Sequence, residues 1–248
     1  MKLSYYSITE KAGRQINEDS VLIASSKKRN IFIVADGLGG HSNGQIASKI
    51  CVETAKEIFL KRESCSLSNL IEEIFADTQK KILELVSEFN PSPPKTTAVI
   101  LITEENRAIY AHVGDSRLYF FRNNNIHSHT LDHSVPQMLV NAGKIKPKDI
   151  RRHPDRNRLL SALGDEHTSP KYEISEILEI LPNDAFLLCS DGFWEKILEK
   201  HMLKTLRSVI KNESNDPAKS WLDALSYRLT SQSGDHKSDN YSAISVIT

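Results

Sequence analysis

The feature that most constrains the fold is an uninterrupted apolar run, residues 31–35, that leads directly into Asp36-Gly37. Such a run is typical of a strand that is buried on both faces. Asp36 would then lie at the tip of a stiff element, where the glycines at 37, 39 and 40 let a carbonyl group or an ion approach the backbone closely. An Asp-Gly pair after a strand is also an ordinary turn, so this segment alone does not decide between the two interpretations.

The same pattern of a short strand followed by an aspartate recurs at three distant places in the chain. Residues 186–189 precede Asp191-Gly192, residues 111–113 precede Gly114-Asp115, and Asp239-Asn240 precedes the apolar residues 241–247. Four independent turns would not be expected to share this arrangement. The strand-end carboxylates therefore predict one site for a hard metal ion, formed by Asp36, Asp115, Asp191 and Asp239.

The ligand type at this predicted site indicates the metal and the chemistry. A site with oxygen ligands alone selects magnesium or manganese. Zinc sites normally use histidine or cysteine ligands, and neither residue occurs at ligand spacing around these aspartates. Two such cations about 4 Å apart can share a water molecule, lower its pKa and hold a phosphoryl group for in-line attack. Arg14, in the polar loop of residues 13–19, could hold phosphate oxygens bidentately, although a loop of solvated charges is the other interpretation. This set predicts phosphate-ester hydrolysis.

Other hydrolytic mechanisms lack their motifs in this sequence. No cysteine is followed by the short loop and arginine of a phosphocysteine mechanism, and no Asp-x-Asp follows the apolar run, as an aspartyl-phosphate enzyme would need. Ser190 lies in Cys-Ser-Asp-Gly rather than in the Gly-x-Ser-x-Gly elbow of a serine nucleophile. The Gly-x-x-x-x-Gly-Lys motif of a nucleotide-binding loop is also absent. These absences favour the metal-dependent route.

Length and composition indicate an ordinary soluble globular protein, and we expect a single domain spanning residues 1–248. The 32 basic residues balance the 32 acidic ones, which gives no reason to expect nucleic acid or an anionic membrane as a partner. No apolar run is long enough to span a bilayer, and the N-terminus has no signal-peptide core. Three cysteines without Cys-x-x-Cys spacing suit a reducing compartment, so we expect a cytoplasmic protein.

The order of predicted elements favours an α+β fold. Helical spacing predicts helices over about 44–61 and 66–89, with the proline-rich residues 90–94 ending the second. Short strands with tight turns over residues 97–130 predict an antiparallel meander, and its first strand should lie in the middle of a sheet. Two more helices, about 198–211 and 216–230, precede the closing strand. This order indicates two packed sheets covered by helices rather than a parallel βαβ sheet.

Residues 144–158 are strongly basic and poor in core residues. They follow a predicted helix that ends at Ala142, with Gly143 well placed to terminate it. The segment is either a solvated loop or a mobile flap next to an anionic substrate.

Eight short motifs occur in the order found in the metal-dependent protein phosphatases of the PPM family, also called protein phosphatase type 2C. The chain resembles the compact bacterial members of that family over nearly its whole length. The motifs are Arg14-x-x-Asn17-Glu18-Asp19, Asp36-Gly37-x-Gly39-Gly40-His41, Thr96-Thr97-Ala98, Val113-Gly114-Asp115-Ser116-Arg117, Asp132-His133-Ser134, His153-Pro154 with Leu163-Gly164, Ser190-Asp191-Gly192-Phe193-Trp194, and Asp239-Asn240.

The resemblance implies a four-layer αββα sandwich, two mainly antiparallel sheets flanked by helices, with the metal ions in a cleft at one edge. By position, Asp36 would bridge two tightly held ions and Gly37 would ligate one of them through its carbonyl group. Asp191 and Asp239 would complete the shell of the other ion. Asp115 matches the aspartate that, with Asp191, supports a third and weaker metal ion in bacterial relatives.

The resemblance also implies roles for residues around the metal ions. Glu18 and Asp19 would act through water molecules, Arg14 would bind the substrate phosphate, and residues 144–158 fall where the family has its flap. Animal relatives place a histidine, a candidate general acid, right after the Asp-Gly pair, where this chain has Leu38. His41 is then a candidate proton donor, with a purely structural role as the alternative.

We therefore expect a protein serine/threonine phosphatase that uses Mn²⁺ or Mg²⁺ and acts, as a monomer, on the substrates of a cognate serine/threonine kinase. Two alternatives stay open: a catalytically weak relative that binds phosphopeptides, and a phosphatase of small molecules. The intact aspartates disfavour the first. The broad basic segment, without an aromatic nucleotide clamp, disfavours the second.

Overall fold

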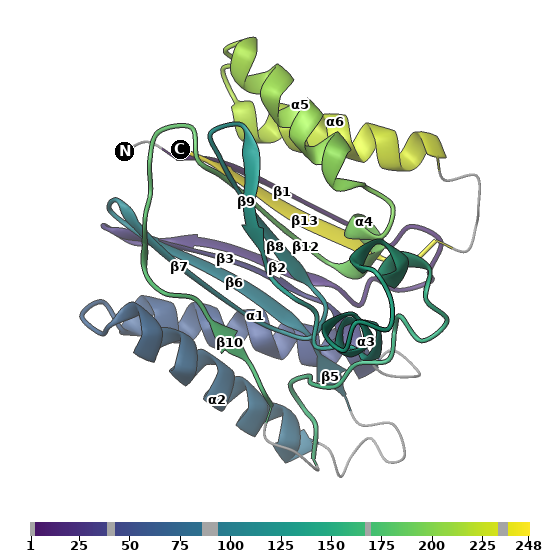
Figure 1. The fold of residues 1–248 in the computed structure, drawn as a ribbon. Coiled ribbons are helices and arrows are strands. Elements are labelled where there is room, and N and C mark those ends of the chain that lie inside the picture. The colour runs from purple at the N-terminus through teal and green to yellow at the C-terminus, as the bar shows by residue number, and fades with distance from the viewer. Residues whose placement is uncertain (1–2, 39–42, 86–93, 167–169, 233–237) are drawn as a thin grey trace.

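A computed structural model describes residues 3–38, 43–85, 94–166, 170–232 and 238–248. Two β-sheets face each other in this part of the chain, and a pair of long helices covers the outer face of each (Figure 1). Helices α1 (Asn43–Lys61) and α2 (Leu67–Leu85) cover one sheet, and α5 (Glu199–Lys211) and α6 (Pro217–Gln232) cover the other (Figure 1). The predicted four-layer αββα sandwich is confirmed.

The sheet under α5 and α6 has the strand order β1-β13-β12-β8-β9, with every neighbouring pair antiparallel. The two strands that carry predicted site residues at their ends, β12 and β13, are interior and fully buried. Because they are antiparallel, the end of β12 lies beside the beginning of β13, where Cys189 pairs with Ala243. The strands are β1 (Ser4–Glu10), β8 (Arg117–Arg122), β9 (Asn125–His129), β12 (Ala185–Cys189) and β13 (Tyr241–Ile247).

The sheet under α1 and α2 has the order β10-β7-β6-β3-β2, and β11 also pairs with β7. Its middle strand is β6, as the apolar sequence at this position predicted. A short ladder of β4 (Gly37–Leu38) and β5 (Lys95–Thr96) continues from the end of β3. The strands of the main sheet are β2 (Ser20–Ser25), β3 (Arg29–Ala35), β6 (Ala98–Glu104), β7 (Arg107–Val113), β10 (Glu173–Ile174) and β11 (Leu178–Glu179).

Strand β3 is apolar throughout because its side chains alternate between two cores. Ile31 and Ile33 are fully buried among side chains of α1 and α2, whereas Phe32 and Val34 are fully buried between the two sheets. A third core fills the space between the other sheet and helices α5 and α6. The strand is therefore fixed on both faces, and Asp36 leaves it at a fixed place.

The predicted meander over residues 97–130 is wrong in one respect: the hairpins β6–β7 and β8–β9 belong to different sheets. After β7 the chain crosses at residues 114–116, and β8 then pairs with β12 instead of β7. Gly114 has a φ of +95°, and a Cβ there would lie 2.5 Å from the Thr97 side chain. Glycine is therefore required at the crossing, which places Asp115 at the ends of both sheets.

The other helices agree with their sequence signals. The hydroxyl of Ser134 caps α3 (Val135–Asn141) by accepting from the Gln137 amide, and Gly143 follows the helix with a φ of +66°. The basic residues 144–158 contain a 3₁₀ helix, η3 (Pro147–Arg152), which the buried Ile150 anchors. The predicted continuation of α2 to residue 89 lies outside the described residues. None of the described helices has an apolar stretch that could cross a membrane.

Candidate metal centre and active site

A pocket of about 180 Å³ lies where the ends of β3, β7 and β12 meet the beginning of β13. All four strand-end aspartates of the predicted metal site are among its lining residues. The structure thus brings together carboxylates from four distant parts of the sequence. The lining residues are Arg14, Glu18, Asp36, Gly37, Leu38, Asp115, Asn157, Leu159, Asp191, Asp239 and Asn240.

The backbone of Asp36 and Gly37 is held tightly at the end of β3. The Asp36 carbonyl oxygen accepts a 2.9 Å hydrogen bond from the Thr97 amide, and the Asp36 amide donates to the Thr97 hydroxyl at 3.3 Å. Gly37 has no room for a side chain, because a Cβ would lie 2.2 Å from the Gly44 carbonyl oxygen and 2.6 Å from that of Glu18. Glycine at position 37 therefore lets the first turn of α1 and the 13–19 loop close on the pocket.

Asp191 and Asp239 lie close together because β12 ends where β13 begins. Asp191 opens a single-turn helix, α4 (Asp191–Trp194). A Cβ on Gly192 would lie 1.9 Å from the Asn240 carbonyl oxygen, so this turn packs directly on the backbone that carries Asp239. The Asp239 carboxylate accepts a 2.8 Å hydrogen bond from Arg14 in a half-exposed ion pair.

Asn240 fastens the loop that carries Arg14 and Glu18. Its side-chain oxygen accepts from the Glu18 amide at 2.9 Å, and its side-chain nitrogen donates to the carbonyl oxygens of Lys11 and Ile16 at 2.9 and 3.0 Å. These three hydrogen bonds hold the loop over the pocket. The Arg14 and Glu18 side chains therefore face the same space as the aspartates.

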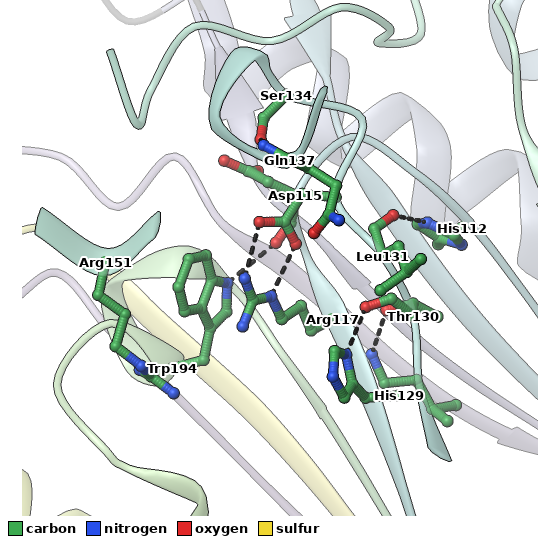
Figure 2. Close-up of polar contacts among 12 residues, drawn as sticks. His112, Asp115, Arg117, His129, Thr130, Leu131, Ser134, Gln137, Arg151 and Trp194 are labelled. Atoms are coloured by element: carbon green, nitrogen blue, oxygen red, sulfur yellow. Dashed lines mark hydrogen bonds and ion pairs between the residues drawn. The ribbon is translucent and has the colours of Figure 1, made fainter. Parts of the chain in front are cut away.

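Asp115 is buried at the crossing between the sheets, and a polar network surrounds it (Figure 2). Its carbonyl oxygen accepts a 2.9 Å hydrogen bond from the indole nitrogen of Trp194. The Arg117 guanidinium lies 3.5 Å from the centre of the Trp194 ring and makes two 2.7 Å hydrogen bonds to Asp132. Arg151 lies farther from the same ring, at 5.3 Å, so the network reaches the basic segment (Figure 2).

The basic segment contributes to the pocket and is only partly solvated. Asn157 of this segment and Leu159, which directly follows it, line the pocket, although no motif in the sequence marked them. Arg151 is mostly buried and lies 2.5 Å from the Glu199 carboxylate. The solvated-loop interpretation of residues 144–158 is therefore wrong for Arg151, whereas Asn157 is exposed at the edge of the pocket.

Burial and mutual repulsion raise the pKa of the carboxyl groups at the pocket. The pKa of Asp36 lies well above its ordinary value because the group is buried, and the charges of Asp19 and Asp191 raise it further. Burial raises the pKa of Asp191 to about 7 and that of Asp19 to about 6. Burial, with the nearby charge of Asp191, also holds the pKa of Asp115 well above its usual range. A multivalent cation would cancel this repulsion and favour the ionised carboxylates.

The donor set fits magnesium or manganese. Its side-chain ligands are carboxylate oxygens, and no histidine or cysteine is among the described residues that line the pocket. Oε1 of Glu18 is buried and accepts no hydrogen bond from the described residues, which indicates a missing donor or cation. Asp19 does not line the pocket; it lies behind, and accepts a 2.8 Å hydrogen bond from the Ser190 hydroxyl. His41 lies outside the described residues, so its role stays a prediction.

Comparison with known proteins identifies the family. The sequence model of the family described as protein phosphatase 2C matches residues 10–226. The serine/threonine phosphatase stp of Listeria welshimeri is 34% identical over 202 residues, which are 79% of this chain and 79% of that protein. The chain belongs to the protein phosphatase 2C family.

Solved structures of other phosphatases share this fold. The S. agalactiae serine/threonine phosphatase superposes with a TM-score of 0.83 at 22% identity over 100% of each chain. The catalytic domain of PstP, a phosphatase of Mycobacterium tuberculosis, was solved in complex with two manganese ions; it has a TM-score of 0.78 at 24% identity over 99% of this chain and 97% of that chain. The protein is thus a serine/threonine phosphatase of bacterial type, as its motifs predicted. Asp239 lies beyond the residues that the family match covers, and the structure places it in the pocket.

Proposed function

We propose that Asp36, Gly37, Asp191 and Asp239 hold two Mn²⁺ or Mg²⁺ ions, and that this pocket hydrolyses phosphoserine and phosphothreonine. The convergence of strand-end aspartates on one small pocket supports the proposal most strongly. When bound, such ions activate a water molecule and neutralise the phosphoryl group during in-line displacement. Asp115, together with Asp191, would hold a third and weaker ion.

Residues behind the pocket keep these ligands in place. Asp19 accepts a hydrogen bond from the hydroxyl of Ser190, the residue before Asp191, and so connects the 13–19 loop to α4. Glu18 presents a buried oxygen without a described hydrogen-bond donor, which suits a water molecule held at the metal site. We therefore expect Asp19 to act through Ser190, and Glu18 to act through a water molecule.

Arg14 is proposed to bind the substrate phosphate. Its guanidinium now pairs with Asp239 at 2.8 Å, and the neighbouring carboxylates Glu18 and Asp191 also favour its positive charge. A cation held by Asp239 would satisfy that carboxylate. The guanidinium, half exposed at the pocket, would then be available for two phosphate oxygens.

The size of the pocket supports a protein substrate over a small molecule. Its volume, about 180 Å³, is below the roughly 300–1,000 Å³ typical of pockets that enclose a whole small ligand. A phosphorylated side chain that enters from a protein surface needs less space. Several cations on the neighbouring segment are exposed and would attract acidic phosphoproteins: Lys144, Lys146, Lys148, Arg152 and Arg158.

We further propose that the substrates come from a cognate serine/threonine kinase and that the protein acts as a cytoplasmic monomer. The proposed metal ligands and Arg14 line one pocket within a single chain, so the site needs no residue from a second subunit. Cys51 and Cys189 are buried free thiols and Cys65 is a half-buried one, which supports a reducing compartment.

Turnover of two substrates tests the proposal. A phosphothreonine peptide and a small aryl phosphate are assayed with Mn²⁺, with Mg²⁺ and with a chelator. We expect metal-dependent hydrolysis of both, with a higher kcat/KM for a peptide that carries acidic flanking residues. Tight peptide binding without hydrolysis at any metal concentration would instead indicate a phosphopeptide-binding relative, and hydrolysis of the aryl phosphate alone a small-molecule phosphatase.

A further inference from the structure

A second cluster of potential metal ligands lies outside the aspartate pocket. One ring nitrogen each from His112 and His133 and a carboxylate oxygen of Glu173 all lie within 4.8 Å of one another. Glu173 on β10 pairs directly with His112 on β7, and the His133 ring stacks on that of His112 with a centroid distance of 4.5 Å. Strand register and ring stacking therefore fix this group.

The His112 ring has the hydrogen-bonding arrangement of a metal ligand. Its Nε2 lies 2.7 Å from the Leu131 carbonyl oxygen, a contact visible in Figure 2. A carbonyl oxygen only accepts, so Nε2 carries the proton and Nδ1 keeps its lone pair. Histidines that bind metal ions characteristically donate their other N–H to such a carbonyl group. Burial also lowers the pKa of His112 and of His133, which favours the neutral imidazoles that bind metals.

The exposure of the three side chains leaves a route for an ion. His112 is buried, whereas the side chain of Glu173 is 67% exposed. His133 lies between these extremes, with 14% of its side chain exposed. An ion could therefore arrive from solvent at Glu173 and lose water as the imidazoles replace it.

We propose that His112, His133 and Glu173 form a site for a borderline divalent ion such as Zn²⁺, with solvent at the fourth position. Two nitrogen ligands and one carboxylate suit zinc, and they favour it over manganese or magnesium. The site differs in this respect from the aspartate pocket, whose donors are oxygens. One chain would thus hold two classes of metal site with different selectivity.

Zinc binding at this site would affect Asp115 through His133. Nε2 of His133 faces Glu173 at 3.7 Å, while its Nδ1 accepts a 3.2 Å hydrogen bond from the Gly114 amide. Ligation through Nε2 moves the ring proton to Nδ1, which can then no longer accept from Gly114. The Gly114 amide, which directly precedes Asp115 in the chain, would then have lost its hydrogen-bond acceptor. Zinc at this site should therefore lower turnover, an effect that rests on the proposed function of Asp115.

Zinc binding itself can be measured without any assay of activity. The Mn²⁺-loaded protein is dialysed against buffered Zn²⁺, and bound zinc and manganese are both counted. We expect one zinc ion per chain with no loss of manganese, and an affinity on the order of 100-fold lower after Glu173→Gln, which removes a ligand. Glu176→Gln, at another exposed glutamate near the same strand, serves as the control and should bind zinc like the wild type. Equal zinc binding in all three proteins, or zinc taken up only as manganese is lost, would overturn the site.

The effect on activity is a separate measurement on the same three proteins. Without zinc, all three should hydrolyse a phosphothreonine peptide equally. At a zinc concentration that fills the site, the wild type and Glu176→Gln should lose several-fold in kcat, while Glu173→Gln keeps its rate. Zinc bound through Glu173 with unchanged kcat would overturn the connection to Asp115. Absence of turnover in every protein without zinc would refute the proposed function and leave the zinc count valid.

Discussion

The indole N–H of Trp194 donates a 2.9 Å hydrogen bond to the backbone carbonyl group of Asp115. Trp194 closes the helical turn that Asp191 opens, so this hydrogen bond joins the backbone segments that carry Asp115 and Asp191, the two residues expected to share the third metal ion. The Arg117 guanidinium covers one part of the indole ring at 3.5 Å and is itself fixed by Asp132. The relative position of Asp115 and Asp191 thus depends on the Trp194 side chain.

Trp194→Phe should weaken the third metal site without affecting the two tight ones. The change keeps an aromatic ring but removes the donor to Asp115, at a cost of about 1 kcal/mol in the free energy of unfolding. Turnover should then need more Mn²⁺ to reach its maximum, with little change in KM. Trp221→Phe is a matched control, because Trp221 is equally buried and donates to the Met202 carbonyl oxygen at 3.0 Å in the core under α5 and α6. A similar shift in manganese dependence for both variants would refute this role of Trp194.

Asp115→Ala tests the third metal site itself. The alternative is that Asp115 only closes the turn between β7 and β8, in which case the variant loses about 1 kcal/mol of stability and keeps its activity. If Asp115 helps to hold a weak ion, the variant should bind two metal ions normally in a calorimetric titration and lose most of its turnover at every Mn²⁺ concentration. Wild-type turnover with only a lower melting temperature would show that Asp115 is a turn residue.

Arg14→Ala should raise KM for a phosphothreonine peptide and lower kcat/KM by on the order of 2–3 kcal/mol, because the guanidinium no longer holds phosphate. Arg62→Ala is the control: Arg62 makes a similar, partly exposed ion pair with Glu73, at 2.7 Å against 2.8 Å for Arg14 and Asp239, and does not line the pocket. Steady-state kinetics of both variants decide the matter. Unchanged kinetics for Arg14→Ala would show that Arg14 is only a solvated charge in the 13–19 loop.

The raised pKa values at the pocket predict how the metal-free protein responds to pH. Asp191 and Asp19 have a pKa of about 7 and about 6 in the folded protein, against about 3.9 for an unperturbed aspartate. Between these values the folded state binds more protons than the unfolded state, so the free energy of unfolding contributed by these groups falls as the pH rises from about 4 to about 7. Burial lowers the pKa of His112 and of the partly buried His133, so the free energy of unfolding that these two groups contribute falls as the pH falls.

Thermal unfolding in a chelator isolates the contribution of the carboxyl groups. Asp191→Asn should raise the melting temperature more at about pH 8 than at about pH 5, because the charge it removes is present only at the higher pH. In the wild type, Mn²⁺ should stabilise more at about pH 8, where the carboxylates are ionised. A stabilisation by Asp191→Asn that is equal at both pH values would contradict this account.

The sequence predicted the site better than it predicted the strand pairing. The four aspartates could be found because each follows or precedes a strand whose apolar residues are visible locally. In strand β3, for example, the unbroken apolar sequence already indicates that both faces of the strand are buried. The crossing at Gly114 was missed because a short polar turn permits either a continued meander or a change of sheet, and the choice depends on the distant strand β12.

Contacts between residues far apart in the sequence were also beyond prediction. The sequence did not predict that His112 and His133 meet, because their rings stack only through the crossing at residues 114–116 and the turn before α3. Asn157 and Leu159 reach the pocket because η3 folds the basic segment back onto α5 through Arg151 and Glu199. Neither the periodicity of the sequence nor any motif in it predicts such a contact.

The central claim is that Asp36 holds the metal ions on which hydrolysis depends. Calorimetric Mn²⁺ titration of wild type and Asp36→Asn, alongside turnover of a phosphothreonine peptide, tests it most directly. A neutral amide cannot supply the charge that the bridging position requires. We predict that the variant is folded, and at least as stable as the wild type without metal because a buried carboxyl group is removed. It should lose tight Mn²⁺ binding and all measurable turnover. Tight binding of two Mn²⁺ ions with wild-type turnover in Asp36→Asn would contradict the account.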